Sequence, residues 1–230
     1  MSDKFIIENG VIIDHEISSE TDTEVVFPKD ATAIGENLFC GYNNIVSVSI
    51  PDSIVSINDC AFQSCTGLKS VLIPSSVKTI GEFAFEYCES LQSAVLLNGI
   101  TSIGYGAFSN CELLTNITIP DSVTDLQGSA FSSCTGLLTL SIPGSIKTVS
   151  ETAFYNCTGL TSVVIGDGVE SIESQAFAFC ENLKTVIIPE SVNFIDSDAF
   201  EDCENLTIIS IPGSCAWQFA EDNNIDFMAQ

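Results

Sequence analysis

A phenylalanine recurs every 23 residues through most of this 230-residue chain. The members of this Phe column are Phe39, Phe62, Phe85, Phe108, Phe131, Phe154, Phe177 and Phe200. A cysteine follows each of the last seven at an offset of three residues, and Tyr42 takes that place in the first copy. Self-similarity at one fixed period predicts a repeat protein whose units pack against their neighbours.

Each unit contains one short strand. In the segment LLTLSIP, Leu140 and Ile142 alternate with Thr139 and Ser141, which is the period of a half-buried strand. Pro143 cannot donate a ladder hydrogen bond, so it is expected to end that strand. A proline stands on the same grid in seven units, and Leu97 and Gly166 fill the two remaining places. The strands are therefore expected to stack in parallel along the chain.

A short turn completes each unit. Ala153, Phe154 and Cys157 have the spacing of residues on one face of a single helical turn. One unit cannot bury its apolar positions alone, whereas a stack of units can. The predicted fold is a mostly-β α/β repeat solenoid, with parallel strands on one face and helical turns on the other.

The consensus L-x-x-V-x-I-P-x-S-V-x-x-I-x-x-x-A-F-x-x-C resembles the BspA-like leucine-rich repeat of the Treponema pallidum type. The resemblance implies a right-handed leucine-rich-repeat superhelix with concave strands and convex turns. It also implies one continuous domain: an N-terminal hairpin cap over 1–27, about eight repeats over 28–212, and a C-terminal cap over 213–230. An open terminal rung would expose the core, so caps are also expected on physical grounds.

The charge balance excludes two classes of partner. The chain has 31 acidic residues against six lysines and no arginine, for a net charge of -25. Nucleic acid and anionic membranes both require cationic partners, so neither is expected as a ligand. No apolar run reaches the ~18 residues of a membrane span, and no signal peptide or anchor is visible. The chain as given is expected to be cytoplasmic, whereas the resemblance suggests a secreted or cell-surface protein.

The cysteines are the first candidates for chemistry. Cys134 and its column are expected to be buried packing residues, with disulfides or a metal site as the open alternative. Cys40, Cys60 and Cys215 lie off the column and are expected to be ordinary residues, because few cations are available to lower a thiol pKa. Zinc ligation would require paired C-x-x-C motifs with histidine, which do not occur.

Other reaction centres find little support. The single histidine, His15, is the only base that a Ser or Cys nucleophile could use, and it is expected to be a solvated hairpin residue. The segment DSDAFEDCEN, residues 196–205, does not follow the EF-hand spacing, which leaves a weak surface cation site as an alternative. The chain is therefore expected to be non-enzymatic and to need no cofactor or metal.

The outward positions of the strands form the most informative surface. They are expected at Ser47, Ser49, Ser70, Leu72, Ser93, Val95, Asn116, Thr118, Thr139, Ser141, Ser162, Val164, Thr185, Ile187, Ile208 and Ser210. None is charged, which either reflects β-propensity or marks a neutral surface for a partner. Lys69 and Lys184 border this strip. Phe83, Tyr87, Tyr105, Tyr155 and Phe179 lie near the turns and suggest a second patch on the convex face.

These features favour a protein-interaction module, expected to be monomeric. BspA-like relatives are generally regarded as surface adhesins or interaction proteins, so the resemblance implies attachment to a host or neighbouring-cell protein. The alternative is a carbohydrate-binding module, although the strip lacks the aromatic rings that sugar platforms use, and Trp217 stands alone near the C-terminus.

Overall fold

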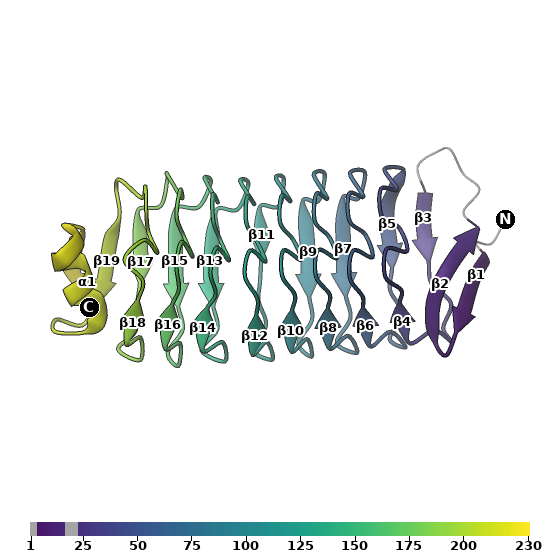
Figure 1. Ribbon diagram of the computed structural model, residues 1–230, viewed down its shortest axis with the longest axis horizontal. Helices are drawn as coiled ribbons and strands as arrows, with labels where there is room; N and C mark the ends of the chain where they lie inside the picture. The colour runs from purple at the N-terminus through teal and green to yellow at the C-terminus, as the bar shows by residue number, and fades with distance from the viewer. Residues whose placement is uncertain (1–3, 17–22) are drawn as a thin grey trace.

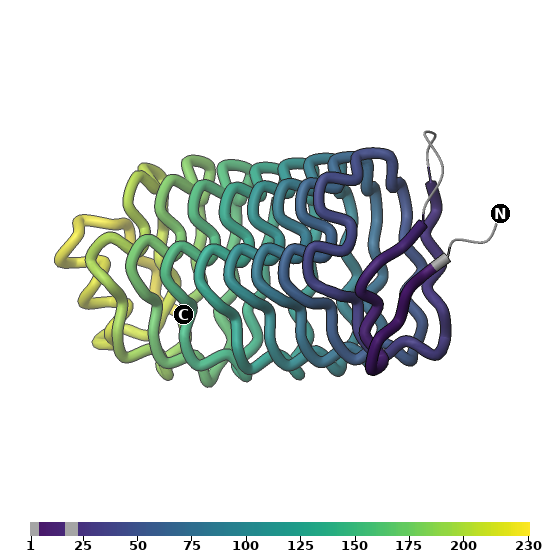
Figure 2. The backbone as a smooth tube through the Cα atoms, turned by 45° about the vertical axis from the view of Figure 1, so that its right-hand side comes forward, coloured from purple at the N-terminus to yellow at the C-terminus, as the bar shows by residue number. Residues whose placement is uncertain are grey.

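The computed structural model describes residues 4–16 and 23–230, which form a parallel β-solenoid (Figures 1 and 2). The rungs follow one another in chain order from the N-terminal hairpin to a C-terminal helix, as Figure 1 shows. This confirms the predicted mostly-β solenoid of 23-residue repeats. In the described part of the chain, no helix is long and apolar enough to span a membrane.

Two ladders of parallel strands run along the solenoid. The long-strand ladder contains β3 (Thr23–Val26), β5 (Ile45–Ser49), β7 (Ser70–Ile73), β9 (Ser93–Leu96), β11 (Asn116–Ile117), β13 (Thr139–Ile142), β15 (Ser162–Ile165), β17 (Thr185–Ile187), β19 (Thr207–Ser210) and β20 (Asp226–Ala229). The short-strand ladder contains β4 (Ala33–Ile34), β6 (Ser56–Ile57), β8 (Thr79–Ile80), β10 (Ser102–Ile103), β12 (Asp125–Leu126), β14 (Thr148–Val149), β16 (Ser171–Ile172) and β18 (Phe194–Ile195). Strand pairing breaks between β11 and β13 in the first ladder, and between β12 and β14 in the second.

The Phe column forms the centre of the core. Consecutive rings stack with centroids 5.1–5.5 Å apart and planes within 12° of parallel. All but the last of these phenylalanines are fully buried. Stacking at nearly the spacing of parallel strands lets one residue type fill the same site in every rung.

The turns that carry the phenylalanines are tighter than an α-helix. In one of them, Cys65 N–H donates to the Phe62 carbonyl at 3.1 Å, which closes an i→i+3 turn. Ser64 adopts φ 58° and interrupts any helical continuation. Phe62 N–H instead donates to the carbonyl of Ala84 in the next repeat at 2.8 Å. Each turn is therefore held by its neighbour as well as by itself.

The N-terminal end is closed by the antiparallel hairpin of β1 (Lys4–Glu8) and β2 (Val11–Glu16). Contrary to the predicted solvated position, His15 on β2 is partly buried, and its ring stacks on Phe39 with centroids 4.5 Å apart. Its Nε2 forms a hydrogen bond of 3.1 Å with the Leu38 carbonyl. In the later repeats, the equivalent carbonyl, just before the phenylalanine, accepts the amide of the phenylalanine one repeat earlier. His15 thus supplies both the ring and the hydrogen bond of a missing preceding rung.

The range predicted for the N-terminal cap holds more than the hairpin. Residues 1–3 and 17–22 lie outside the described residues. Strand β3 falls within the same range, yet it pairs in parallel with β5. It therefore acts as a rung of the long-strand ladder.

Helix α1 (Cys215–Asn223) and strand β20 close the C-terminal end. The Ser214 side chain accepts a hydrogen bond from Trp217 N–H and caps the helix N-terminus, and Asn224 ends the helix in the left-handed conformation. The Phe219 ring contacts Phe200 edge-on with centroids 5.9 Å apart, so it covers the last ring of the column.

The prediction for the last strand was wrong by one residue. Thr185 on β17 pairs with Thr207 on β19, a spacing of 22 residues, so Ile208 and Ser210 face the core and are fully buried. A one-residue slip reverses every side chain of a strand, and the run Ile208–Ile209 offers an apolar residue in either register. Ser210 is satisfied in the core because its hydroxyl donates to the Ile188 carbonyl at 2.7 Å.

Candidate protein-binding surface

The structure places twelve predicted strand positions on one face of the long-strand ladder, all exposed or half-buried. This outer strand surface consists of Ser70, Leu72, Ser93, Val95, Asn116, Thr118, Thr139, Ser141, Ser162, Val164, Thr185 and Ile187. Ser47 and Ser49 on β5 continue it toward the N-terminus. Lys69 and Lys184 are exposed immediately before their strands.

Strand pairing arranges this surface in two rows. One row carries mainly hydroxyl groups, because Ser70 pairs with Ser93 and Thr139 with Ser162. In the other row, Leu72 pairs with Val95 at 52% and 47% exposure. Val164, in the same row beyond the break in the ladder, is 40% exposed. The surface therefore combines a polar, uncharged row with a mixed row, in which Thr118 and Ser141 separate Leu72 and Val95 from Val164 and Ile187.

The acidic side chains lie elsewhere. Glu89, Glu112, Glu181 and Glu204 occupy one position of the turn in four repeats, and all are exposed. None of the twelve residues of the outer strand surface is charged, although the chain has a net charge of -25. Burying a charge against a partner is costly, so the uncharged surface has the lowest desolvation cost for binding.

The cysteines are all free thiols, and the seven in the column are buried. Cys134 is fully buried, and burial raises the pKa of its thiol to about 12. A thiol with so high a pKa is a poor nucleophile and a poor metal ligand at neutral pH. The packing role predicted for the column is therefore confirmed.

The off-column cysteines also lack an activating environment. Cys40 is exposed and its thiol donates to Gln63 Oε1 at 3.4 Å. Partial burial raises the pKa of both the Cys60 and Cys215 thiols. In the described ranges, no group of three or more His, Cys, Asp or Glu side chains is placed to hold a metal ion.

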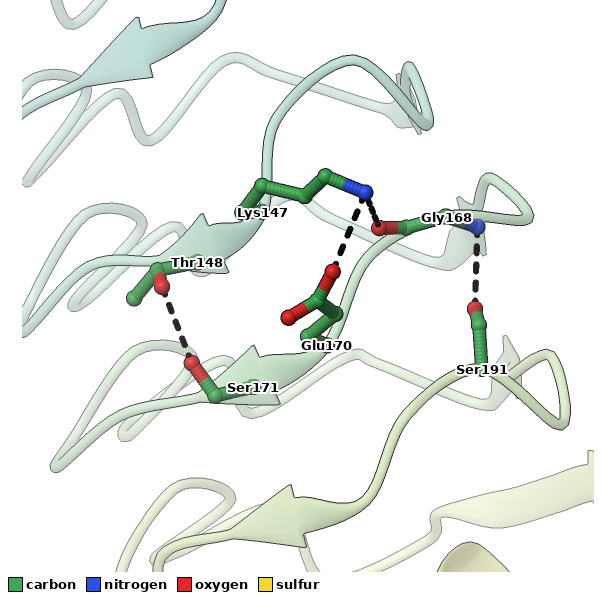
Figure 3. Close-up of polar contacts among 6 residues, drawn as sticks. All are labelled: Lys147, Thr148, Gly168, Glu170, Ser171 and Ser191. Atoms are coloured by element: carbon green, nitrogen blue, oxygen red, sulfur yellow. Dashed lines mark hydrogen bonds and ion pairs between the residues drawn. The ribbon is translucent and has the colours of Figure 1, made fainter.

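A set of polar contacts that the repeat pattern did not predict braces the turns beside the short strands (Figure 3). Lys147 Nζ donates to the Gly168 carbonyl at 3.0 Å and lies 3.1 Å from Glu170 Oε1. Gly168 N–H donates in turn to Ser191 Oγ at 2.9 Å, so three successive repeats are connected. Beside them, Ser171 and Thr148 join their hydroxyl groups at 3.0 Å.

The same brace occurs three repeats earlier. Lys78 Nζ donates to the Gly99 carbonyl at 3.2 Å, and Gly99 N–H donates to Ser122 Oγ at 2.8 Å. The two braces lie at the two repeats in which Leu97 and Gly166 replace the proline. The N–H groups of Leu97 and Gly166 donate to the carbonyls of Ile73 and Ile142 and so extend the long-strand ladder by one hydrogen bond. The absence of proline from these two repeats was the sequence signal for the braces. Their role is structural.

The convex aromatic residues occur as two contacting pairs and one separate tyrosine. Phe83 contacts Tyr105 with ring centroids 5.4 Å apart, and Tyr155 contacts Phe179 at 5.2 Å. Tyr87 and Tyr105 are exposed, whereas the other three are half-buried. The two pairs lie in different repeats and therefore divide the predicted second patch.

Comparison with known proteins agrees with this architecture. The BspA-type leucine-rich repeat region, in six copies, matches residues 17–137 and 101–217. The leucine-rich repeat protein of T. pallidum is 25% identical over 79% of this chain and 88% of its own, with a TM-score of 0.71. The pneumococcal vaccine antigen PcpA, 16% identical over 90% of this chain and 67% of its own, shares the fold with a TM-score of 0.52.

A comparison with curated protein sequences returns no significant match. The family match covers most of the chain and includes the strands from β3 to β19. Leucine-rich repeat domains generally act as protein-interaction scaffolds. The chain belongs to the BspA-type leucine-rich repeat family.

Proposed function

We propose that this protein is a non-enzymatic interaction module that binds another protein through its outer strand surface. The observation that carries the proposal is the uncharged surface of twelve residues across β7 to β17 in a strongly acidic chain. Its exposed side chains at Leu72, Val95 and Val164 supply apolar area, and the neighbouring serines and threonines supply hydrogen-bond groups. Protein interfaces combine such groups and are depleted of charge at their centres.

The proposed role is attachment to a protein on another cell or on a host. A solenoid suits this role because its rungs hold a long row of side chains in fixed positions, which reduces the entropy lost on binding. Lys69 and Lys184 flank the surface and favour a partner with acidic groups at the matching edges. A sugar platform is disfavoured because none of the twelve residues is aromatic.

A protein array and a glycan array, probed in parallel with the purified chain, test the proposal. We expect saturable binding to one or more proteins and none to glycans. Saturable binding to glycans alone, or to neither array, would overturn it.

A further inference from the structure

The backbone amides of each convex turn donate their hydrogen bonds to carbonyls of the following repeat. Phe177 N–H donates to the Ala199 carbonyl at 2.8 Å, and Phe179 N–H donates to the Glu201 carbonyl at 2.7 Å. The two accepting carbonyls are two residues apart in the chain. The same pair recurs along the Phe column, and from Asn37 to Thr152 a third amide, two residues before each phenylalanine, also donates to the next repeat. Each turn therefore presents these amides toward the C-terminal end.

The last repeat described presents the same two amides, on Phe200 and Asp202, and is followed by helix α1 in place of another 23-residue rung. Within residues 4–16 and 23–230, neither amide has a hydrogen-bond partner. Helix α1 covers the Phe200 ring through Phe219 but leaves both amides open. Phe200 is buried and Asp202 is exposed, so this end of the solenoid keeps two amides that no protein acceptor in the described ranges pairs, at an edge that solvent or a partner can reach.

The open amides border a hollow of about 540 Å³ between the last turn and the C-terminal cap. Its apolar lining residues are Phe200, Cys203, Leu206, Phe219 and Ile225. Its acidic lining residues are Glu201, Asp202, Glu204 and Asp226, all exposed, and no lysine lines it. An anion would be repelled from such a site despite the amides, whereas a neutral carbonyl beside a cationic side chain would be attracted.

We propose that this hollow binds a basic peptide segment of a partner protein. Two backbone carbonyls of the segment, two residues apart, accept hydrogen bonds from Phe200 N–H and Asp202 N–H. The carbonyls of Ala199 and Glu201 accept from Phe177 N–H and Phe179 N–H in the same way. Lysine or arginine side chains of the segment pair with the carboxylates at the rim. The segment thereby takes the place of a further rung, which is recognition by addition of backbone to an open edge. The site is separate from the outer strand surface and does not depend on its role.

Amide hydrogen exchange tests the backbone contacts directly. The probe is the acetylated and amidated peptide Ala-Lys-Ala-Lys-Ala-Lys, added to the full chain at physiological salt. In the free protein, the amides of Phe200 and Asp202 should exchange faster than those of Phe177 and Phe179. Saturating probe should slow the first pair by about tenfold or more and leave the second pair unchanged. Absence of binding, or binding without this protection, would overturn the proposal.

Charge variants test the rim. The triple variant Glu201→Gln, Glu204→Gln, Asp226→Asn should raise the dissociation constant of the probe about tenfold. The control Glu89→Gln, Glu112→Gln, Asp52→Asn removes the same charge from exposed sites elsewhere and should change it less than about twofold. Equal effects of the two variants would show general attraction to an acidic protein and would contradict a site in the hollow.

Discussion

The thiol of Cys134 donates a hydrogen bond of 3.2 Å to the backbone carbonyl of Phe108, which lies 26 residues earlier. The same carbonyl accepts the amide of Cys111 at 3.3 Å, so both of its lone pairs are used. All seven cysteines of the column make the equivalent contact, at 3.2–3.3 Å. The column therefore joins each turn to the preceding repeat.

Replacing Cys134 by alanine should destabilise the fold without affecting binding. The substitution removes a buried side chain and one hydrogen bond, at a cost of about 1–3 kcal/mol in the free energy of unfolding. Urea denaturation measures this cost, and Cys60→Ala, off the column and only half-buried, should cost less than about 1 kcal/mol. In the native protein, a thiol reagent should modify Cys40 rapidly and Cys134 only on unfolding. Equal reaction rates at the two sites would contradict the buried thiol ladder.

The thiol column should make the fold sensitive to alkali. Burial raises the thiol pKa from an ordinary 9.0 to about 12 for Cys134, about 12 for Cys65 and about 11 for Cys203. Below pH 9 the thiols are protonated in both the folded and unfolded chains, and their contribution to stability is fully present. Between pH 9 and about 12 the unfolded chain loses protons that the folded chain retains, so stability falls.

The stability of the wild type is compared with that of Cys134→Ala at each pH. The difference reports the Cys134 thiol alone, because the lysines titrate in both proteins. Each pH unit above 9 favours the unfolded wild type by about 1.4 kcal/mol per thiol. The stability difference between wild type and variant should therefore shrink by about 2 kcal/mol between pH 8 and pH 10.5. Urea denaturation under reducing conditions at both pH values provides the measurement. A difference that stays constant would mean that the folded thiol ionises at its ordinary pKa.

His15 should stabilise the N-terminal end through two separable contributions. His15→Phe keeps a ring against Phe39 but leaves the Leu38 carbonyl without its hydrogen bond, at a cost of about 1 kcal/mol. His15→Ala also removes the stacked ring and should cost about 2 kcal/mol or more. Thermal and urea denaturation of both variants check these values. Equal stability of wild type and His15→Ala would show that the histidine is a solvated residue after all.

The turn at Gly168 should tolerate no side chain. Its φ is 111°, and a Cβ would lie 2.5 Å from the Gly144 carbonyl oxygen, so Gly168→Ala should cost about 3 kcal/mol or more. Gly41 has φ 80° with open space around it, and Gly41→Ala should cost only about 1 kcal/mol. Lys147→Met removes an exposed ion pair and the exposed hydrogen bond to the Gly168 carbonyl, and should cost about 1 kcal/mol or less. The order of the three urea midpoints is the readout, and a Gly168→Ala midpoint at or above that of Gly41→Ala would refute the close backbone approach.

The repeat pattern was sufficient to predict the solenoid, the stacked column and the exposed strand positions from Ser70 to Ile187. A fixed period of 23 residues sets the rungs, and strict alternation within each strand decides which side chains face the core. The pattern failed at the last strand, where Ile208 and Ile209 make two registers equally apolar.

The repeat pattern did not predict the contacts that close the two ends, or the braces, for a different reason. A repeat pattern describes residues that have equivalents in the next rung, whereas His15 has none and acts by replacing an absent rung. The open amides of Phe200 and Asp202 likewise leave no mark in the sequence, because every phenylalanine of the column looks the same there. The braces of Lys78 and Lys147 were signalled only by the missing prolines at Leu97 and Gly166.

Charging the outer strand surface tests whether it binds the partner. The dissociation constant for the strongest protein ligand from the array is measured for wild type and two triple variants. Leu72→Asp, Val95→Asp, Val164→Asp charges the outer strand surface, whereas Val55→Asp, Tyr87→Asp, Phe194→Asp charges exposed apolar sites on other faces. Thermal denaturation first establishes that both variants fold. We expect the first variant to weaken binding at least about 100-fold and the second less than about threefold. Unchanged binding by the first variant, or equal losses in both, would contradict a binding role for the outer strand surface.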